Sequence, residues 1–452
     1  MNLVLILIGV IAFIVIATSK FKLHPFLTLI LAAFIAAFAY GLPSGEIAKT
    51  ITTGFGNILG YIGLVIVLGT IIGIILEKSG AAITMADVVI KVLGKRFPTL
   101  TMSIIGYLVS IPVFCDSGFV ILNSLKQSMA NRMKVSSVSM SVALATGLYA
   151  THTFVPPTPG PIAAAGNLGL ESNLGLVIGV GLFVAAVAAL AGMLWANRFA
   201  DVEPDGEGAE ELKAQASDYE TLKKSYGTLP SPLKAFAPIF VPIVLICLGS
   251  IANFPSAPLG KEAVFDALVF LGQPVNALMI GLFLSLLLLK GENKISEFSE
   301  RISQGLVTAA PIILITGAGG AFGAVLKATP IGDFLGTSLS ALGIGIFMPF
   351  IVAAALKSAQ GSSTVALVAT SALVAPMLGD IGLGSDMGRV LTVMAIGAGA
   401  MTVSHANDSF FWVVTQFSRM SVKQAYKAQT MATLIQGVTS MVTVYVLSLV
   451  LL

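Results

Sequence analysis

The sequence predicts an all-α polytopic membrane protein built from two inverted repeats. Three observations lead to this fold class: the composition of the chain, the spacing of its apolar runs, and polar interruptions that come in two matching pairs. Of the 452 residues, 56% are hydrophobic and 10% are charged, and the mean hydropathy is +0.95. A soluble domain carries about 25% charged residues. The chain is therefore expected to lie in a lipid bilayer.

Apolar runs of about 20 residues mark the expected spans, because that length crosses the hydrocarbon core of a membrane. The first run follows Met-Asn with no basic segment, so it is expected to be a transmembrane helix and not a cleaved signal peptide. The expected uninterrupted spans are 3–18, 26–41, 56–76, 174–196, 234–252, 267–289, 305–326 and 429–452.

Two further regions, 99–166 and 341–417, contain apolar runs that are too short or too interrupted to cross the bilayer. The interruptions are "CDSG" and "THTFVPPTPGP" in the first region and "KSAQGSST" and "SHANDS" in the second. Backbone that faces lipid cannot break in this way, because its amides and carbonyls would lose their hydrogen bonds. Each region is therefore expected to form a re-entrant helical hairpin followed by a broken helix, with the breaks buried or lining a cavity.

The two halves of the chain resemble each other around these breaks. "GTIIGIILEKSG" from Gly69 aligns with "GGAFGAVLKATP" from Gly319, and "ALATGLYATH" ending at His152 aligns with "AIGAGAMTVSH" ending at His405. Each half is expected to have five spans, one of them broken, and one hairpin, which gives about ten transmembrane helices plus two hairpins. Five is an odd number of crossings, so the second repeat is inverted relative to the first.

The domain boundaries follow from this repeat. The first repeat is expected over 1–198 and the second over 233–452, joined by a charged segment, 199–232, that is typical of a solvated linker. The expected hairpins and broken helices within the repeats are about 99–134 and 136–166 in the first, and about 341–378 and 389–417 in the second.

The positions of the basic residues favour one orientation. With both termini outside, twenty of the 25 lysines and arginines fall in inner loops, including Lys126, four fall in outer loops, and Lys357 remains at the second hairpin tip. This asymmetry is what the positive-inside rule demands. The N- and C-termini are therefore expected outside and the linker 199–232 in the cytoplasm.

Several function classes lack support in the sequence. Cys115 and Cys247 are the only cysteines, too few for a disulfide framework or a metal cluster. No Walker, H-E-x-x-H or G-x-S-x-G motif is present, and glycine-rich 317–323 is more typical of close helix packing than of a nucleotide loop. The net charge of +3 gives no reason to expect a nucleic acid, because the basic residues flank membrane helices. No cofactor, metal or enzymatic activity is expected.

The four breaks predict a single binding site. Pro156, Pro157, Pro159 and Pro161 exclude a continuous helix. Secondary transporters build a central site where hairpin tips and broken helices meet, and the N-termini of half-helices suit a carboxylate. The expected substrate contacts are Ser117, Gly118, His152, Thr153, Pro157, Thr158, Ser362, Ser363, Thr364, His405 and Asn407.

Four stretches of the sequence resemble the gluconate permease family: "PVFCDSGFVIL", "ATHTFVPPTPGP", "AGNLG" and "SHANDS". Members of that family are bacterial inner-membrane proton symporters for sugar acids and related hydroxy acids, within the ion transporter superfamily. The resemblance covers essentially the whole chain, and "THTFVPPTPGP" is its most specific motif. It implies the bacterial inner membrane, proton coupling, a homodimer, and an elevator-type displacement of the hairpin-bearing domain against a scaffold.

Two residues depart from that family's pattern. The family has a glutamate after an aromatic residue where this chain has Asp116 after Cys115, and a histidine at the position of Thr158. Both departures lie where substrate is expected to bind. Gluconate, another hydroxy acid such as glycerate, and a small amino acid such as D-serine are all compatible with this scaffold.

Asp116, His405 and Asp408 are the candidate proton-coupling residues. Asp116 is expected either to bind a proton together with the substrate, because loss of hydration disfavours the ionised form, or to cap the helix from Gly118. Asp408 is expected to pair with His405 or, with Asn407, to cap the helix from Ser409. Lys357 is expected either to neutralise a substrate carboxylate or, slightly favoured, to snorkel outward.

These features predict a proton-driven symporter for a small hydroxylated carboxylate. The nearest alternative is coupling to sodium, which serine and carbonyl oxygens at the hairpin tips would bind. A passive anion channel needs a pore lined by rings of like residues, which the paired breaks do not suggest. A hydrolytic site made of His152, His405 and Asp408 would lack an activated nucleophile.

Overall fold

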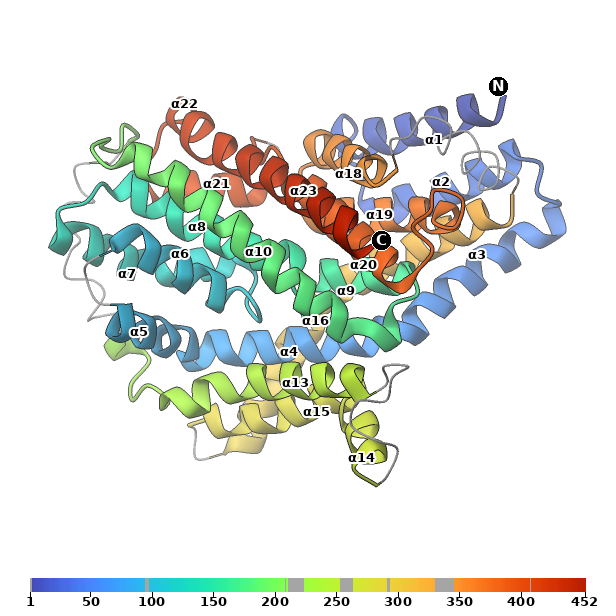
Figure 1. Ribbon diagram of the computed structural model, residues 1–452. Helices are drawn as coiled ribbons and strands as arrows, with labels where there is room; N and C mark the ends of the chain where they lie inside the picture. The colour runs from blue at the N-terminus through green and yellow to red at the C-terminus, as the bar shows by residue number, and fades with distance from the viewer. Residues whose placement is uncertain are drawn as a thin grey trace.

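The computed structural model describes residues 2–93, 97–207, 209, 223–252, 263–290, 293–329, 345–406 and 408–452. These residues form helices and connecting turns, with no strand among them. Long helices lie side by side across the molecule, with shorter helices between them (Figure 1). The fold is all-α, as the sequence predicts.

The first half of the chain has ten α-helices in the described ranges. A π-helical turn, Leu59–Gly63, joins the third and fourth without a break, so this helix begins twelve residues earlier than the expected span 56–76. The helices are α1 Asn2–Ser19, α2 Pro25–Ala39, α3 Ser44–Ile58, α4 Leu64–Ser79, α5 Ala81–Leu93, α6 Pro98–Val109, α7 Cys115–Met133, α8 Ser137–Phe154, α9 Pro159–Asn167 and α10 Leu174–Ala196.

The second half also alternates long and short helices. A π-helical turn, Tyr426–Thr430, again joins two of them. The helices described are α13 Pro232–Ala252, α14 Ala263–Leu271, α15 Pro274–Ser285, α16 Lys294–Lys327, α18 Phe347–Gln360, α19 Ser363–Val374, α20 Asp386–Met401, α21 Ser409–Phe417, α22 Val422–Ala425 and α23 Met431–Leu451.

Fewer helices are long enough to cross a membrane than the ten that the sequence predicts. Within the described residues, five helices or helix runs are long and apolar enough, and seven if each of two bent pairs counts as one span. The bent pairs are α4 with α5, at 72°, and the α14 region with the α15 region, at 70°. Shorter apolar stretches lie in α1, α2, α6, α18 and α19.

The segments expected to form hairpins and broken helices are each two consecutive helices in the structure. The hairpin segments are α6–α7 and α18–α19, and the broken-helix segments are α8–α9 and α20–α21. α7 packs against α8 and α21, while α19 packs against α9 and α20. Elements from both halves of the chain are therefore interlocked around the breaks.

Glycines allow these elements to approach closely. A Cβ at Gly73 of α4 would overlap the carbonyl oxygen of Pro112 at the first hairpin tip, and one at Gly323 of α16 would lie 2.9 Å from the carbonyl oxygen of Ala372 in α19. These are two glycines that the sequence alignment pairs. Small residues at such contacts maximise van der Waals packing between membrane helices.

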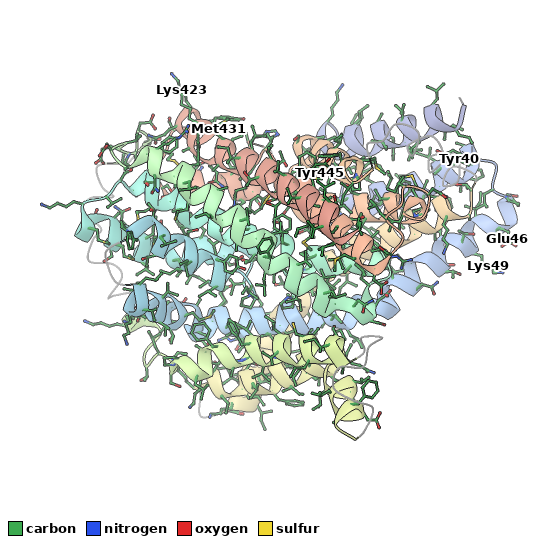
Figure 2. All side chains as sticks on the ribbon, viewed as in Figure 1. Tyr40, Glu46, Lys49, Lys423, Met431 and Tyr445 are labelled. Carbon is green, nitrogen blue, oxygen red and sulfur yellow. The ribbon has the colours of Figure 1, made fainter. Side chains whose placement is uncertain are left out.

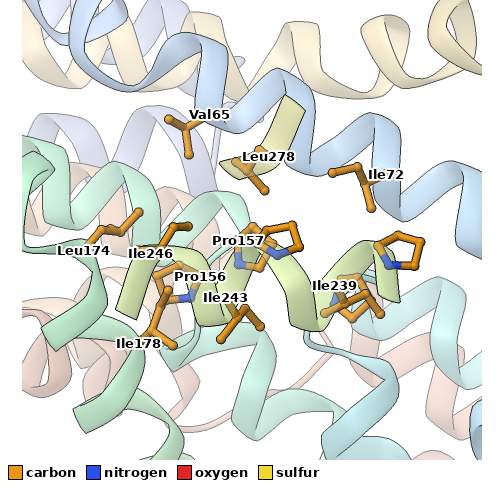
Figure 3. Close-up of a pocket in the computed structure, with 13 residues that line it drawn as sticks. Val65, Ile72, Pro156, Pro157, Leu174, Ile178, Ile239, Ile243, Ile246 and Leu278 are labelled. Carbon is orange, nitrogen blue, oxygen red and sulfur yellow. The ribbon is translucent and has the colours of Figure 1, made fainter. Parts of the chain in front are cut away.

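The first hairpin tip and the α8–α9 break pack against α4, α10, α13 and α15 through an apolar contact surface. Figure 3 shows Pro156 and Pro157 facing Ile239 and Ile243 of α13, with residues of α4, α10 and α15 around them. The space between these side chains is about 10 Å³, too little for more than one water molecule. This surface is apolar and closely packed.

Charged side chains lie mostly at the ends of the helices. In Figure 2, Lys423 marks one end of the bundle, and Glu46 and Lys49 lie toward the other. Of the linker 199–232, residues 208 and 210–222 lie outside the described part, but Lys223 pairs with Asp87 of α5 at 2.6 Å. The end of the linker is therefore held against the first half of the chain.

Two lysines depart from their expected surroundings. Lys126, expected in an inner loop, is fully buried in α7, and its Nζ donates to Ser141 Oγ of α8 at 3.0 Å. Lys357, expected either to neutralise a substrate carboxylate or to snorkel outward, is also fully buried. The loop position of Lys126 and the snorkelling of Lys357 are wrong because packing of the neighbouring helices, which hydropathy does not report, covers these side chains.

Candidate functional site

A cavity of about 320 Å³ lies where both hairpin tips and both broken helices meet. Each of the four breaks contributes a short run of residues or a pair from the adjoining helix. The lining residues are Phe114, Cys115 and Asp116 from α7 and its start, Tyr149 and His152 from α8, Gly361, Ser362, Ser363 and Thr364 from the second hairpin tip, and Asp408, Ser409 and Phe410 from the start of α21.

Asp116 is a carboxyl group in this cavity without a basic partner among the described residues. Helix α7 begins at Cys115, three residues earlier than expected, which places Asp116 in its first turn and not at its cap. The Cys115 thiol lies 3.6 Å from Asp116 Oδ2, while Oδ1 is buried with no hydrogen-bond partner in the described part of the chain. Asp116 therefore has no cation beside it among the described residues, and its polar surroundings are the start of α7, the Cys115 thiol and the Ser409 hydroxyl.

Asp408 is fully partnered, in contrast. Its Oδ2 accepts from Lys357 Nζ at 2.6 Å and from the Ser404 hydroxyl, and its Oδ1 accepts from the main-chain amide of Phe410 at 3.1 Å. It is the N-cap of α21, as one of the sequence alternatives proposed. The cap and the ion pair together use both oxygens of this carboxyl group.

His405 does not make the expected pair with Asp408. Its Nε2 lies 2.8 Å from the main-chain oxygen of Ser358, in the last turns of α18, and Lys357 takes the place beside the carboxylate. The main-chain amide of Asp408 donates to the carbonyl of His405 at 2.8 Å, so the two residues are linked through their backbone and not through their side chains. His405 does not line the cavity.

His152 presents an unpartnered nitrogen in the cavity. The side chain is 6% exposed, and its Nδ1 atom has no hydrogen-bond partner in the described residues. The ring stacks on Tyr149 with centroids 6.5 Å apart and lies 5.9 Å from Phe114. A buried polar atom is normally hydrogen-bonded, so this nitrogen is suited to a ligand hydroxyl or carboxylate.

Small hydroxyl side chains surround the start of α19. Ser362 is its N-cap and accepts from the amide of Val365 at 3.2 Å, and Ser363 and Thr364 form its first turn beside the cavity. The N-terminus of a helix carries partial positive charge and free amides. This end of the cavity is suited to an anionic group.

Several expected contact residues lie outside the cavity lining. Thr153 and Thr158 donate their hydroxyls to main-chain oxygens of Tyr149 and Val155, so these hydroxyls satisfy their own segment. Pro157 lies in the apolar contact surface of Figure 3. Ser117 and Gly118, also expected as substrate contacts, are not among the lining residues. Asn407 lies outside the described residues.

The cavity also contains residues that sequence reasoning did not select. Phe114, Tyr149, Gly361 and Phe410 line it. Tyr149 lies one helical turn before His152, so the 3.6-residue period would have placed it on the same face. The other three flank residues that were selected, but nothing in their chemistry distinguishes them. No cluster of three or more metal-ligating side chains occurs in the described ranges.

Similar proteins of known fold share this architecture. The transporter YdaH of Alcanivorax borkumensis superimposes with a TM-score of 0.67 at 13% identity, over 94% of this chain and 98% of that structure. MtrF of Neisseria gonorrhoeae superimposes with a TM-score of 0.61 at 14% identity, over 96% and 97%. At these identities the likeness concerns the fold alone.

Sequence relatives cover almost the whole chain. A gluconate permease of Pseudomonas aeruginosa is 34% identical over 452 residues, 98% of this chain and 97% of the relative. The D-serine transporter DsdX of Escherichia coli is 32% identical over 445 residues, 97% of each. The profile of the family described as "GntP family permease" matches residues 1–450. The chain is thus a membrane permease rather than an enzyme, and it belongs to the GntP permease family.

Proposed function

We propose that this permease carries out proton-coupled uptake of a small hydroxylated carboxylate, such as gluconate or glycerate, across the bacterial inner membrane. The observation that carries the proposal is the pair of carboxyl groups in one cavity: Asp408 has its own cation, and Asp116 has none. The carboxylate of the substrate is proposed to bind at the start of α19, near Ser363 and Thr364.

The charge of the cavity explains why proton and substrate would bind together. With the Lys357–Asp408 pair neutral, an ionised Asp116 gives the cavity a net charge of −1, which repels an anion. Protonation of Asp116 removes that charge and adds a hydroxyl donor for the substrate. In a partly buried site of low dielectric constant this difference is larger than it would be in water. Asp116 is therefore the proposed proton carrier.

His152 is the proposed partner for substrate hydroxyls. Its free Nδ1 atom lies in the same cavity as the Ser362–Thr364 segment. A polyhydroxylated acid would place its carboxylate at α19 and a hydroxyl group at the imidazole. Ser117, Gly118, Thr153, Pro157, Thr158 and His405 are proposed to act only through the packing of the breaks in this state, since the cavity lining does not include them.

The transport movement is proposed to be an elevator-type displacement of the hairpins and broken helices within a homodimer. The apolar surface around Pro156 and Pro157 supports this idea, because its lining consists of proline, valine, leucine and isoleucine side chains, which do not form hydrogen bonds with one another. The inverted repeat, the outer location of both termini and the cytoplasmic location of the linker 199–232 complete the proposal and rest on the sequence pattern.

A second candidate substrate is a zwitterionic amino acid such as D-serine. An ionised Asp116 without a cation would bind the ammonium group, while α19 binds the carboxylate. A relative named for D-serine transport makes this candidate specific. Sodium coupling is the alternative ion choice, with hydroxyl and carbonyl oxygens of the hairpin tips as ligands. A passive anion channel would need no coupling ion.

Uptake by the purified protein in sealed vesicles tests these alternatives. Gluconate, glycerate and D-serine are each supplied with an inward proton gradient, with and without sodium, and with a protonophore. We expect a hydroxy acid to accumulate above its outside concentration, independently of sodium, and a protonophore to abolish the accumulation. Accumulation of D-serine alone would select the second candidate, a sodium requirement would replace the coupling ion, and simple equilibration would indicate a channel.

A further inference from the structure

Lys357 connects two of the four breaks through one buried ammonium group. Its side chain has no exposed surface, and its Nζ donates to Asp408 Oδ2 at 2.6 Å and to the carbonyl oxygen of Gly361 at 2.5 Å. Gly361 forms the tip of hairpin α18–α19 and has a φ of +90°, which glycine adopts without steric cost. The same cation therefore contacts the hairpin tip and the cap of α21.

Lys357 contacts residues that line the cavity without lining it itself. Asp408 lines the cavity, whereas Lys357 does not. The ammonium lies 6.0 Å from the ring centroid of Tyr149, which adds a favourable cation–π contact from α8. A substrate would meet the carboxylate and not the lysine. Direct contact between Lys357 and a substrate carboxylate, one of the sequence alternatives, does not fit this arrangement.

We propose that Lys357 is a positioning residue of the substrate site: it fixes the hairpin tip to the cap of α21 and neutralises Asp408, so that Asp116 alone sets the charge of the cavity. The inference rests on the proposed function in taking this cavity as the substrate site. It goes beyond that function because it assigns opposite roles to two aspartates that lie in one cavity.

The charge of the cavity then depends on Lys357 and Asp408 as a pair. Lys357→Met leaves Asp408 as a second carboxylate without a cation and makes the cavity more negative. Asp408→Asn leaves the ammonium unbalanced and makes it more positive. The double variant removes both charges and returns the cavity to its original balance. A purely structural role of Lys357 predicts no such reversal.

Cys115 provides a direct reporter, because its thiol lines the same cavity. In a Cys247→Ser background it is the single cysteine of the chain. The rate of its reaction is measured with sulfonatoethyl methanethiosulfonate, which is anionic, and with trimethylammonioethyl methanethiosulfonate, which is cationic. Methyl methanethiosulfonate, which is neutral, corrects for changes in thiolate fraction and in access. The anionic-to-cationic rate ratio then reports the local potential.

We expect the ratio to fall by at least about tenfold in Lys357→Met, to rise in Asp408→Asn, and to return to the starting value in the double variant, since the reagents carry opposite charges. Lys126→Met is the matched control, because this buried lysine does not line the cavity, and it should leave the ratio unchanged. If Lys357→Met does not fold, Asp408→Asn and the double variant still give the comparison.

Two results would overturn the inference: unchanged ratios in both single variants, or a double variant that retains the ratio of a single one. The measurement needs no transported substrate and no ion gradient. It therefore separates failure of this inference from failure of the proposed proton-coupled uptake, which the vesicle assay tests by itself.

Discussion

Replacement of Asp116 by asparagine should remove the dependence of substrate affinity on pH. A sphere of 320 Å³ is about 8 Å across, so a substrate carboxylate bound in the cavity would lie within about 8 Å of Asp116. At that distance and an effective dielectric constant of about 20, two negative charges repel by about 2 kcal/mol. This energy corresponds to a factor of about 30 in affinity between the protonated and the ionised carboxyl group.

The sign of the effect follows from the charge. At low pH Asp116 is neutral and the anion binds tightly, whereas at high pH the carboxylate repels it and the apparent KM rises by up to about 30-fold. The Asp116→Asn variant is neutral throughout, so its apparent KM should stay near the low-pH value at every pH. It should also move substrate without a proton, and substrate should no longer accumulate.

The assay is uptake into vesicles between pH 5.5 and 8.5, with an internal pH-sensitive dye to follow protons. Asp266→Asn is the matched control, because Asp266 is exposed on α14 and has the same chemical change. The reasoning would be refuted by an Asp116→Asn variant that keeps both the wild-type pH profile and the proton movement that accompanies substrate.

Three further predictions concern the remaining unusual residues. His152→Gln should raise the apparent KM for a hydroxylated carboxylate by about tenfold, because one hydrogen bond is lost. His405→Gln should change the apparent KM by less than about twofold, because His405 does not line the cavity. Equal effects of the two variants in uptake assays would contradict this prediction. Lys357→Met should lower the free energy of unfolding by about 3 kcal/mol, because it leaves a buried carboxylate unpaired. Lys126→Met should lower it by less than about 1 kcal/mol, because Lys126 has no carboxylate partner in the described residues. Thermal melts that rank the two variants in reverse would count against the charge argument. Gly147→Ala should lower the melting temperature, because the added Cβ would overlap the carbonyl oxygen of Ser103 in α6. Gly179→Ala in α10 should be neutral or stabilising, because there is open space around Gly179. Similar melting temperatures for the two variants would show that α6 and α8 can separate at no cost.

The positions of the breaks could be predicted from the sequence because breaks have strong local signals. Proline at 156 and 157 excludes helix, and hydroxyl and amide side chains interrupt apolar runs where lipid would not tolerate them. α8 ends at Phe154 and α9 begins at Pro159, on either side of this motif. The meeting of the four breaks around one cavity was expected because secondary transporters build a central site where hairpin tips and broken helices meet.

The positions where long helices begin and bend were not predictable in the same way. Hydropathy treats the run from Ser44 to Ile58 as too polar to be part of a span, yet a π-helical turn continues it into α4. The reverse occurs at 267–289, where a bend at Gln273 divides one apolar run into α14 and α15. Helix continuity depends on local hydrogen bonding and neighbouring helices, which composition averages out.

The sequence by itself determined that this protein lies in a membrane, that its helices are interrupted at four places, and that Asp116, His152 and the serines at 362–363 gather near those interruptions. Only the tertiary structure decided which charges are compensated. Lys357 and Asp408 are 51 residues apart in the chain and lie 2.6 Å apart in space, and no local pattern reports such a pair. Because the energy of a buried charge depends on its nearest partner and not on its sequence neighbours, the distinction between the paired Asp408 and the unpaired Asp116 belongs to the fold.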